Sequence, residues 1–159
     1  MADRIAVMNR GGIEQLAAPI EIYDRPASLF VSQFVGTTNL LPGKVAELAS
    51  GRASVALSDG TRFACVPAMA NTVGSDVLVS VRPERLRVHI APTEGALPAT
   101  VKVVMPLGPM VVYEAETRAG EPIKISAPRE GDARLLDPGT AVFLEPAAPD
   151  AARLFPRSP

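Results

Sequence analysis

Few residues of this sequence have the type and spacing that catalysis or metal binding requires. The chain contains one cysteine, Cys65, and one histidine, His89. A cysteine nucleophile needs a neighbouring base, but no motif links His89 to Cys65, and His89 falls on the polar face of a predicted strand. Cys65 alternates with Phe63 in another strand and is expected to pack as a small hydrophobic residue. These counts also exclude a disulfide framework and the usual zinc sites, so we predict no catalytic residue and no metal site.

The stretch from Gly36 to Val45 superficially resembles a phosphate-binding loop, because it contains two glycines followed by a lysine. The glycines are too far apart, and Pro42 removes a backbone N–H that would point at a phosphate. Val45 also stands where a serine or threonine would hold magnesium. We interpret this stretch as a linker and expect no cofactor to bind to this chain.

The most polar cluster bounded by apolar strand contains Arg82, Glu84, Arg85 and Arg87. One interpretation is a solvated turn with a local ion pair, which contributes little to stability. The other is a contact surface, or an anion site built from the three arginines. Both stay open, and these four residues are our candidates for a regulatory or interface site.

The elements that position these residues are predicted to be short and mostly β. The chain has 159 residues, 47% of them hydrophobic, which suits one domain or one domain with a piece of another. Sixteen prolines and 12 glycines favour many short elements joined by turns. Residues 54–57 and 62–66 flank a turn at 58–61 and predict a hairpin. In residues 85–90 apolar and polar side chains alternate, as in a half-buried strand.

The first 36 residues follow a different pattern. A turn cluster at residues 9–12 lies between two short apolar runs and predicts a hairpin. Pro19 can begin a first helix over 19–24. Ser28 is a suitable N-cap for a second helix over 29–35, which Gly36 ends.

The second half of the chain repeats the first at an offset of about 60 residues. The matched segments are residues 45–47 with 101–104, 58–61 with 118–121, 66–67 with 127–128, and 74–79 with 139–144. Two β-units that close against each other predict a small Greek-key barrel of the OB type, with an open sandwich as the alternative. Residues 150–159 are expected to be a frayed tail.

Charge and hydropathy narrow the class of partner. Sixteen Lys and Arg against 17 Asp and Glu give a net charge of −1, which offers no electrostatic attraction for nucleic acid or an acidic membrane. An OB-type nucleic-acid binder also needs stacking aromatics, and the chain has seven Phe and Tyr residues, several at core-like positions. No apolar run is long enough to span a bilayer, and Asp3 and Arg4 lie where a signal peptide would be apolar. We expect a soluble, cytoplasmic chain that does not bind nucleic acid.

Several segments resemble the ATP-binding subunits of bacterial ABC importers, in the branch that includes spermidine/putrescine, iron(III) and maltose types. Residues 1–15 resemble the segment after the switch histidine, and residues 19–27 and 30–41 continue the match. Residues 81–86, Val-Arg-Pro-Glu-Arg-Leu, resemble the signature after the first β-unit of the TOBE domain, a transport-associated OB fold. The resemblance is dense up to Leu41, good around 81–88 and loose from Leu97 onward.

The resemblance implies a division at about residue 36. Residues 1–36 would be the end of a nucleotide-binding domain and residues 37–159 a TOBE regulatory domain. The phosphate loop, signature loop, magnesium-binding strand and switch histidine of the family would lie upstream of Met1, as in a truncated or mis-started chain. This chain would then not hydrolyse ATP, whereas its full-length parent would be an ATPase using ATP and magnesium.

The resemblance also implies partners and a location. Two copies would contact each other and form a homodimer, and the parent would bind transmembrane permease subunits at the inner face of the cell membrane. Polyamine is the transported solute that the resemblance favours, with iron(III) and sugars close behind. The alternative function is ligand sensing, since related domains of the molybdate branch bind oxyanions, and Arg82 and Arg85 could form such a pocket. Glu84 counts against it, because a carboxylate repels anions.

Overall fold

The computed structural model describes residues 3–67, 71–129 and 135–157, and it is mostly β. No helix in these residues is long and apolar enough to cross a bilayer. In chain order the elements are β1 (Ile5–Asn9), β2 (Gly12–Ala17), α1 (Pro19–Asp24), α2 (Leu29–Phe34), β3 (Asn39–Ala49), β4 (Arg52–Leu57), β5 (Arg62–Pro67), β6 (Asp76–Val81), a 3₁₀ turn (Pro83–Arg85), β7 (Leu86–His89), β8 (Leu97–Leu107), β9 (Met110–Thr117), β10 (Pro122–Pro128), β11 (Ala141–Pro146) and β12 (Ala152–Pro156).

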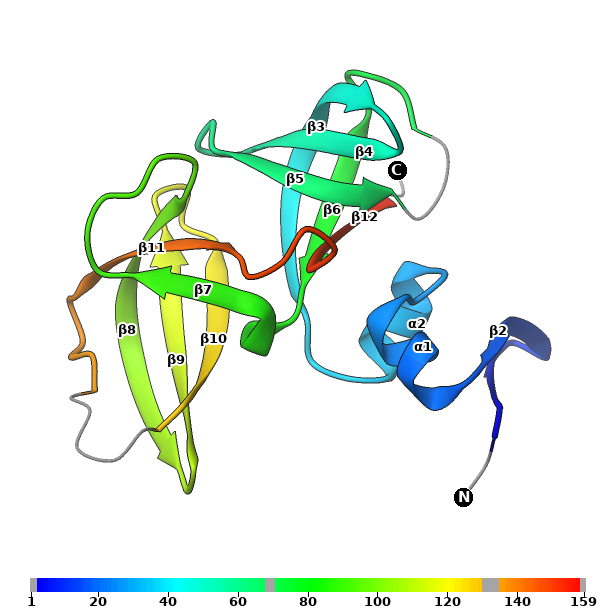
Figure 1. The fold of residues 1–159 in the computed structure, drawn as a ribbon, viewed down its shortest axis with the longest axis horizontal. Helices are drawn as coiled ribbons and strands as arrows, with labels where there is room; N and C mark the ends of the chain where they lie inside the picture. Colours follow the sequence, from blue (N-terminus) through cyan, green and yellow to red (C-terminus); the bar gives the residue numbers. More distant parts are fainter. Residues whose placement is uncertain (1–2, 68–70, 130–134, 158–159) are drawn as a thin grey trace.

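The N-terminal module, residues 3–36, is a hairpin packed on two short helices (Figure 1). Both predicted helices are confirmed, with Pro19 in the opening turn of α1. The hydroxyl of Ser28 accepts a hydrogen bond from the amide of Val31 at 3.3 Å, so Ser28 is the N-cap of α2. A small separate core holds this module together and contains Val7, Ala17, Ile22 and Val31.

The first β-unit is a closed barrel with strand order β12-β5-β4-β3-β6. The predicted linker over 36–45 is wrong from Asn39 onward, because Asn39–Ala49 forms β3, which pairs with both β4 and β6. Pro42 and Gly43 obscured that strand in the sequence. A Cβ on Gly43 would lie 2.6 Å from a methyl of Val55 and 2.9 Å from the carbonyl oxygen of Ala56, so glycine permits the close approach of β3 and β4.

The second β-unit is a five-stranded antiparallel sheet with order β10-β9-β8-β11-β7. The Asn39 side chain joins its edge strand to the first barrel. The Asn39 amide donates to the carbonyl of Lys124 at 2.8 Å and accepts from the Lys124 N–H at 2.7 Å. The buried residues of the two units form one continuous hydrophobic cluster, so the barrel and the sheet share a core.

The two units exchange their last strands. β7 follows the first unit along the chain but pairs with β11 of the second, and β12 follows the second unit but pairs with β6 and β5 of the first. In Figure 1 β7 lies in the second unit and β12 in the first, and the segments that lead into these strands run between the units. The predicted frayed tail is therefore wrong for residues 152–156, where Leu154 and Phe155 are buried. Residues 158 and 159 of that tail lie outside the described residues.

The predicted repeat is confirmed by matching backbone hydrogen bonds, except that residues 66–67 correspond to residues 126–127 and not to 127–128. At equivalent positions of the two units, backbone amides donate hydrogen bonds to equivalent carbonyls. The matched bonds run from Leu57 to Thr61 (2.8 Å) and Thr117 to Glu121 (2.9 Å), and from Gly74 to Val45 (2.8 Å) and Gly139 to Val101 (2.7 Å). The expected mainly β fold with an OB-type barrel is also confirmed, and each unit forms a sheet of its own.

Candidate functional site

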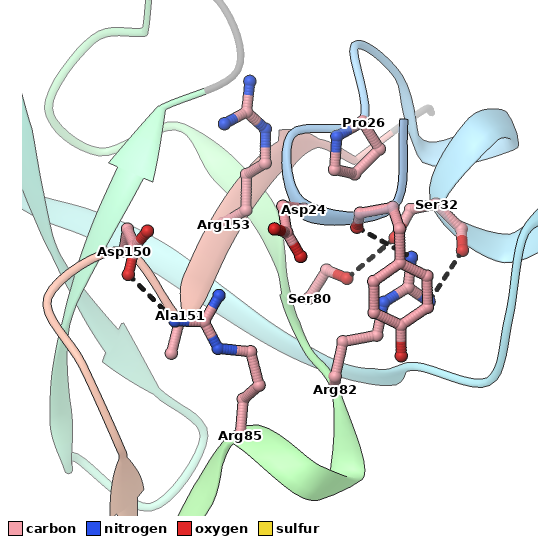
Figure 2. Close-up of a pocket in the computed structure, with 10 residues that line it drawn as sticks. Asp24, Pro26, Ser32, Ser80, Arg82, Arg85, Asp150, Ala151 and Arg153 are labelled. Atoms are coloured by element: carbon pink, nitrogen blue, oxygen red, sulfur yellow. Dashed lines mark hydrogen bonds and ion pairs between the residues drawn. The ribbon is translucent and has the colours of Figure 1, made fainter. Parts of the chain in front are cut away.

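The candidate site is a polar seam between the N-terminal module and the first barrel. We define the seam by Tyr23, Ser32, Thr38, Ser80, Arg82 and Glu84. Three of them, Ser32, Ser80 and Arg82, are buried polar residues. Figure 2 shows Ser80 and Arg82 of the barrel facing Ser32 of α2. The two parts of the chain thus meet through specific hydrogen bonds, which fix their relative position.

Arg82 lies at the centre of the seam, and only 6% of its surface is exposed. Its guanidinium donates to the carbonyls of Ser32 and Gly36, both at 2.9 Å, and to Thr37 at 3.2 Å. It also lies 4.5 Å from the centre of the Tyr23 ring, a cation–π distance. Burial lowers the pKa of this guanidinium from its ordinary value, and the nearby Tyr23, Glu84 and Asp24 oppose that change. An arginine stays charged even so, so the carbonyls and the ring offset its lost hydration.

Glu84 and the serines complete the seam. The Tyr23 hydroxyl donates to the Glu84 carboxylate, and burial, followed by this bond, raises the pKa of Tyr23. The hydroxyl of Ser80 lies 3.1 Å from that of Ser32 and 2.7 Å from that of Thr38. Of the four predicted candidate residues, Arg82 and Glu84 therefore contact the N-terminal module.

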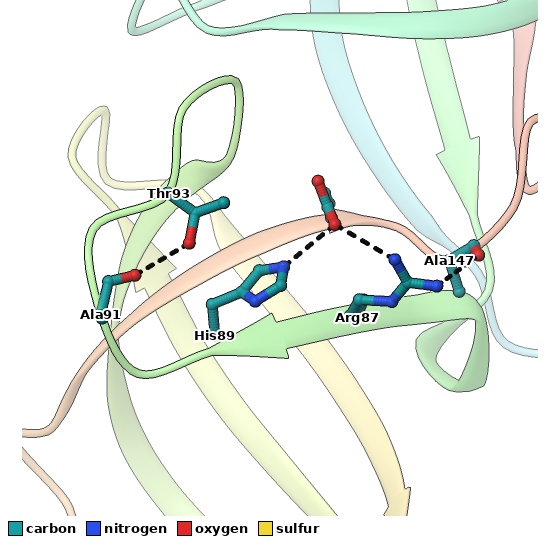
Figure 3. Close-up of polar contacts among 6 residues, drawn as sticks. Arg87, His89, Ala91, Thr93 and Ala147 are labelled. Atoms are coloured by element: carbon teal, nitrogen blue, oxygen red, sulfur yellow. Dashed lines mark hydrogen bonds and ion pairs between the residues drawn. The ribbon is translucent and has the colours of Figure 1, made fainter.

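Arg85 and Arg87 instead contact β11 and the segment that follows it. Arg85 forms an ion pair with Asp150 at 2.9 Å, which lowers the pKa of that carboxyl. Arg87 contacts Glu145 at 3.5 Å and donates to the carbonyl of Ala147 at 3.1 Å (Figure 3). Glu145 also lies 3.0 Å from His89 Nε2, so His89 faces a carboxylate. The structure thus distributes the four residues between two separate contacts.

A narrow pocket lies beside the seam, with Asp24, Arg85, Asp150 and Arg153 among its lining residues (Figure 2). Arg153, on β12, has a buried Nε without a hydrogen-bond partner among the described residues. Burial, and then the charge of Arg25, lower the pKa of Arg153. The pocket's 20 Å³ leaves room for about one water molecule.

Sequence reasoning missed Tyr23, Ser32, Thr38, Ser80 and Arg153 as members of the seam and its pocket. Each lies in an element predicted for packing or, for Thr38 and Arg153, in the predicted linker and the predicted tail. The signal available was a serine within each of two mostly apolar elements, Ser32 in α2 and Ser80 in β6. Cys65 lies where it was predicted, in the core, and burial raises the pKa of its thiol to about 12.

Residues 79–155, which run from β6 through β12 and include Arg82, match the family model described as the TOBE domain. This part of the chain is therefore similar to the TOBE domain. The TOBE match includes both exchanged strands and all four candidate residues of the cluster at 82–87. It therefore extends over the part of the fold in which the two β-units are interlocked.

Similarity to curated proteins extends beyond the TOBE match. The chain is 34% identical over 148 residues to the spermidine/putrescine import ATP-binding protein PotA of Acidothermus cellulolyticus, covering 91% of this chain and 39% of that protein. It is 37% identical over 144 residues to PotA of Rubrobacter xylanophilus, with coverages of 89% and 38%. PotA 1 of Pseudomonas aeruginosa is 34% identical over 155 residues, with coverages of 98% and 42%. The chain thus spans about two fifths of the length of these relatives.

A solved structure supports the fold assignment. The molybdate-bound form of the cytoplasmic molybdate-binding protein ModG has a TM-score of 0.65 to this chain at 19% identity. The superposition covers 75% of this chain and 96% of that one. At this identity the likeness shows that this chain and ModG share a fold.

Proposed function

We propose that this chain is the regulatory and dimerisation end of the ATP-binding subunit of an ABC importer. Residues 1–36 would complete a nucleotide-binding domain, and residues 37–159 would be its TOBE regulatory domain. The observation that carries this proposal is the extent of the similarity, because PotA 1 of P. aeruginosa aligns with 98% of the chain. The relatives therefore share the N-terminal module as well as the TOBE domain.

The surface of the N-terminal module supports a further domain beside it. Six large apolar residues of this module are exposed, and three of them, Met8 (55%), Ile13 (62%) and Leu16 (46%), lie on one face of the β1–β2 hairpin. The opposite face of the hairpin carries Val7 and packs on the helices. An apolar patch of this kind marks a contact surface, which the rest of a nucleotide-binding domain would cover.

The seam supports a regulatory role. Because Arg82 is held by backbone carbonyls of the N-terminal module, a rotation of that module would move the first barrel with it. In the parent, opening and closing of the nucleotide-binding domains would reach the TOBE domain in this way. A dimer whose ATP sites separate in each cycle benefits from a second contact, which keeps the effective concentration of the two subunits high.

The remaining roles belong to the parent protein. The parent would bind ATP and magnesium, couple ATP hydrolysis to solute uptake, and lie at the cytoplasmic face of the membrane on permease subunits. The names of the relatives favour spermidine and putrescine as the solutes.

An immunoblot of cytosol and membrane fractions tests this proposal. We expect a membrane-associated band of more than twice the 16.7 kDa of this chain, since the relatives are longer than twice its length. A cytosolic band at 16.7 kDa would contradict the proposal, because such a chain has no attached ATPase.

A second candidate function is oxyanion sensing at Arg153, whose Nε has no hydrogen-bond partner among the described residues and is a donor that an anion would satisfy. The pocket beside the seam holds about one water molecule, so an oxyanion would bind there only after its lining side chains move. Thermal shift with sulfate, phosphate, molybdate and spermidine tests it, because a bound ligand raises the melting temperature. An oxyanion site predicts a shift with one of the anions that Arg153→Gln abolishes and Arg118→Gln, at an exposed turn, retains. Equal melting temperatures in every solution would exclude this function.

A further inference from the structure

The far end of the β8–β9 hairpin departs from the alternation of a half-buried sheet. The paired residues Thr100 and Glu116, near the start of β8, present polar side chains to solvent, as expected for an outer face. Further along the same face, apart from Glu114, Lys124 and Ser126, the outward residues are apolar. They are Val103, Met105 and Leu107 on β8, Met110 and Val112 on β9, and Pro128 on β10, and we call this set the arm face.

The arm face is accessible to a partner. Val103 is 41% exposed and Leu107 is 57% exposed, and Met105, Met110 and Val112 are partly exposed. The inward residues of the same strands, such as Val111 and Tyr113, are buried in the core. The arm face is therefore not needed to complete that core, and in Figure 1 the hairpin extends below the rest of the second unit.

The equivalent hairpin of the first unit has no such face. We compare the two hairpins between equivalent paired residues, Glu47 and Ser54 in the first unit and Val103 and Glu114 in the second. Measured in this way, the β3–β4 hairpin is four residues shorter than the β8–β9 hairpin. Its outward positions include Lys44 and Glu47, both charged and exposed. The second copy of the repeat has thus gained both length and an apolar outer face, which marks an interaction surface.

We infer that the arm face is the surface through which two copies of this chain associate. This inference rests on the proposed dimerisation and names the residues that perform it. Two flat sheet faces pack about 10 Å apart, and a twofold axis through Met105 would set the apolar side chains of one copy on those of the other.

Charge at the rim favours a second copy over other partners. Glu114 and Lys124 border the arm face, with Glu114 Oε1 and Lys124 Nζ 3.9 Å apart and both side chains about half exposed. Together they are neutral, so two copies brought face to face do not repel each other. An anionic membrane would require an excess of basic residues, which this neutral pair does not supply.

The size of the arm face predicts a weak contact. Six apolar side chains are far fewer than the roughly 20–30 residues per partner of a stable interface. We therefore expect dissociation constants of about 10–1,000 µM. Such affinity suits two subunits that a second interface already holds together.

Sedimentation velocity of the chain over a concentration series tests the inference. The wild type should shift from monomer to dimer as its concentration rises from about 10 µM to 1 mM. Leu107→Glu and Val103→Lys should each remain monomeric throughout, because each places a charge on the arm face. Ala49→Glu is the matched control, since Ala49 is an exposed residue next to the turn of the first unit's hairpin, and it should dimerise like the wild type.

Circular dichroism of each variant establishes that it is folded, and both substituted arm residues are exposed enough to accept a charge. A dimer that persists in Leu107→Glu and Val103→Lys would overturn the inference while leaving dimerisation intact. A wild type that stays monomeric at 1 mM would overturn it as well, and binding of that monomer to anionic lipid vesicles that Leu107→Glu abolishes would assign the arm face to a membrane. The immunoblot result is independent of these outcomes, so the two proposals can fail separately.

Discussion

The two β-units of this chain have equivalent hairpins but differ in the side chains that pack within them. In the first unit Gly43 makes room for the larger Val55, whereas the equivalent positions of the second unit hold Ala99 and Ala115. The combined side-chain volume at these two positions is similar in both units, but it is divided differently between the two strands. The β4–β5 and β9–β10 turns, in contrast, are alike in the two units, with glycine at positive φ at Gly60 and Gly120. The repeat thus keeps this turn, whereas the core, the outer surface and the length of the β3–β4 and β8–β9 hairpins have diverged.

The surfaces have diverged more than the cores. The first unit is tied to the N-terminal module through Arg82 and has a polar outer face, whereas the second unit carries the arm face. The exchanged strands bind these different surfaces into one body, because each unit is completed by a strand that the chain supplies after the other.

The largest effect should come from removing the exchanged strand β12. A chain that ends at Asp150 loses Leu154 and Phe155, both buried in the native structure. Each such loss costs about 2–5 kcal/mol, so we expect the first unit to unfold at 25 °C. Circular dichroism and amide NMR would record this loss. An unchanged melting temperature would show that the barrel does not depend on the exchange.

The next effect should come from the seam. Arg82→Ala should lower the free energy of unfolding by about 2–3 kcal/mol, because it leaves buried carbonyls of the N-terminal module without a donor. Arg87→Ala, which removes an exposed ion pair, should cost less than about 1 kcal/mol. Urea unfolding measures both, and equal losses in the two variants would contradict the central place of Arg82.

The different division of side-chain volume in the two units can be tested by giving the first unit the core residues of the second. Gly43→Ala should destabilise the chain by about 1–3 kcal/mol, since its Cβ would overlap with Val55. Adding Val55→Ala makes the first unit resemble the second and should recover part of that loss. Gly12→Ala, whose Cβ would meet its nearest atom at 3.6 Å, is the control. If the double variant is less stable than the sum of the single losses predicts, the units are not interchangeable in this layer.

The smallest effect should be a pH dependence confined to the first unit. The second unit has Ile125 where the first has Cys65. Burial raises the pKa of Cys65 from 9.0 to about 12, so the folded chain holds the thiol proton more tightly than the unfolded chain does. Its contribution to stability is complete below pH 9 and is lost at up to about 1.4 kcal/mol per pH unit between pH 9 and 12. Urea unfolding of wild type and Cys65→Val at pH 8 and pH 10 measures this, and parallel losses in the two proteins would contradict it.

Local features of the fold were predictable from the sequence because their causes are local. Ser28, Pro19 and the turn glycines act on backbone groups within a few residues, and each has the predicted role. The repeat was also predictable, since both copies conserve the turn that follows the first hairpin. Neither Pro42 nor Gly43 is typical of a strand, which is why β3 was mistaken for a linker.

The strand exchange and the seam depend on contacts that no local pattern records. Arg82 binds carbonyls some 45–50 positions earlier in the chain, and carbonyls carry no sequence signal. β12 is a short apolar run among prolines. The strands with which it pairs are separated from it in sequence by the whole second unit. The cluster at residues 82–87 could be found in the sequence by its polarity. The residues that its members contact could not be found in this way.

On this proposal, the arm face gives the second unit a contact that the first unit lacks. Cross-linking with a short bismaleimide tests it most directly, because the buried native Cys65 has a protonated thiol and should not react. Met105→Cys, at the centre of the arm face, should give a covalent dimer at 200 µM protein. Ala49→Cys, on the equivalent hairpin of the first unit, should remain monomeric under the same conditions. Equal yields of dimer from the two variants, or dimer from Ala49→Cys alone, would contradict the account.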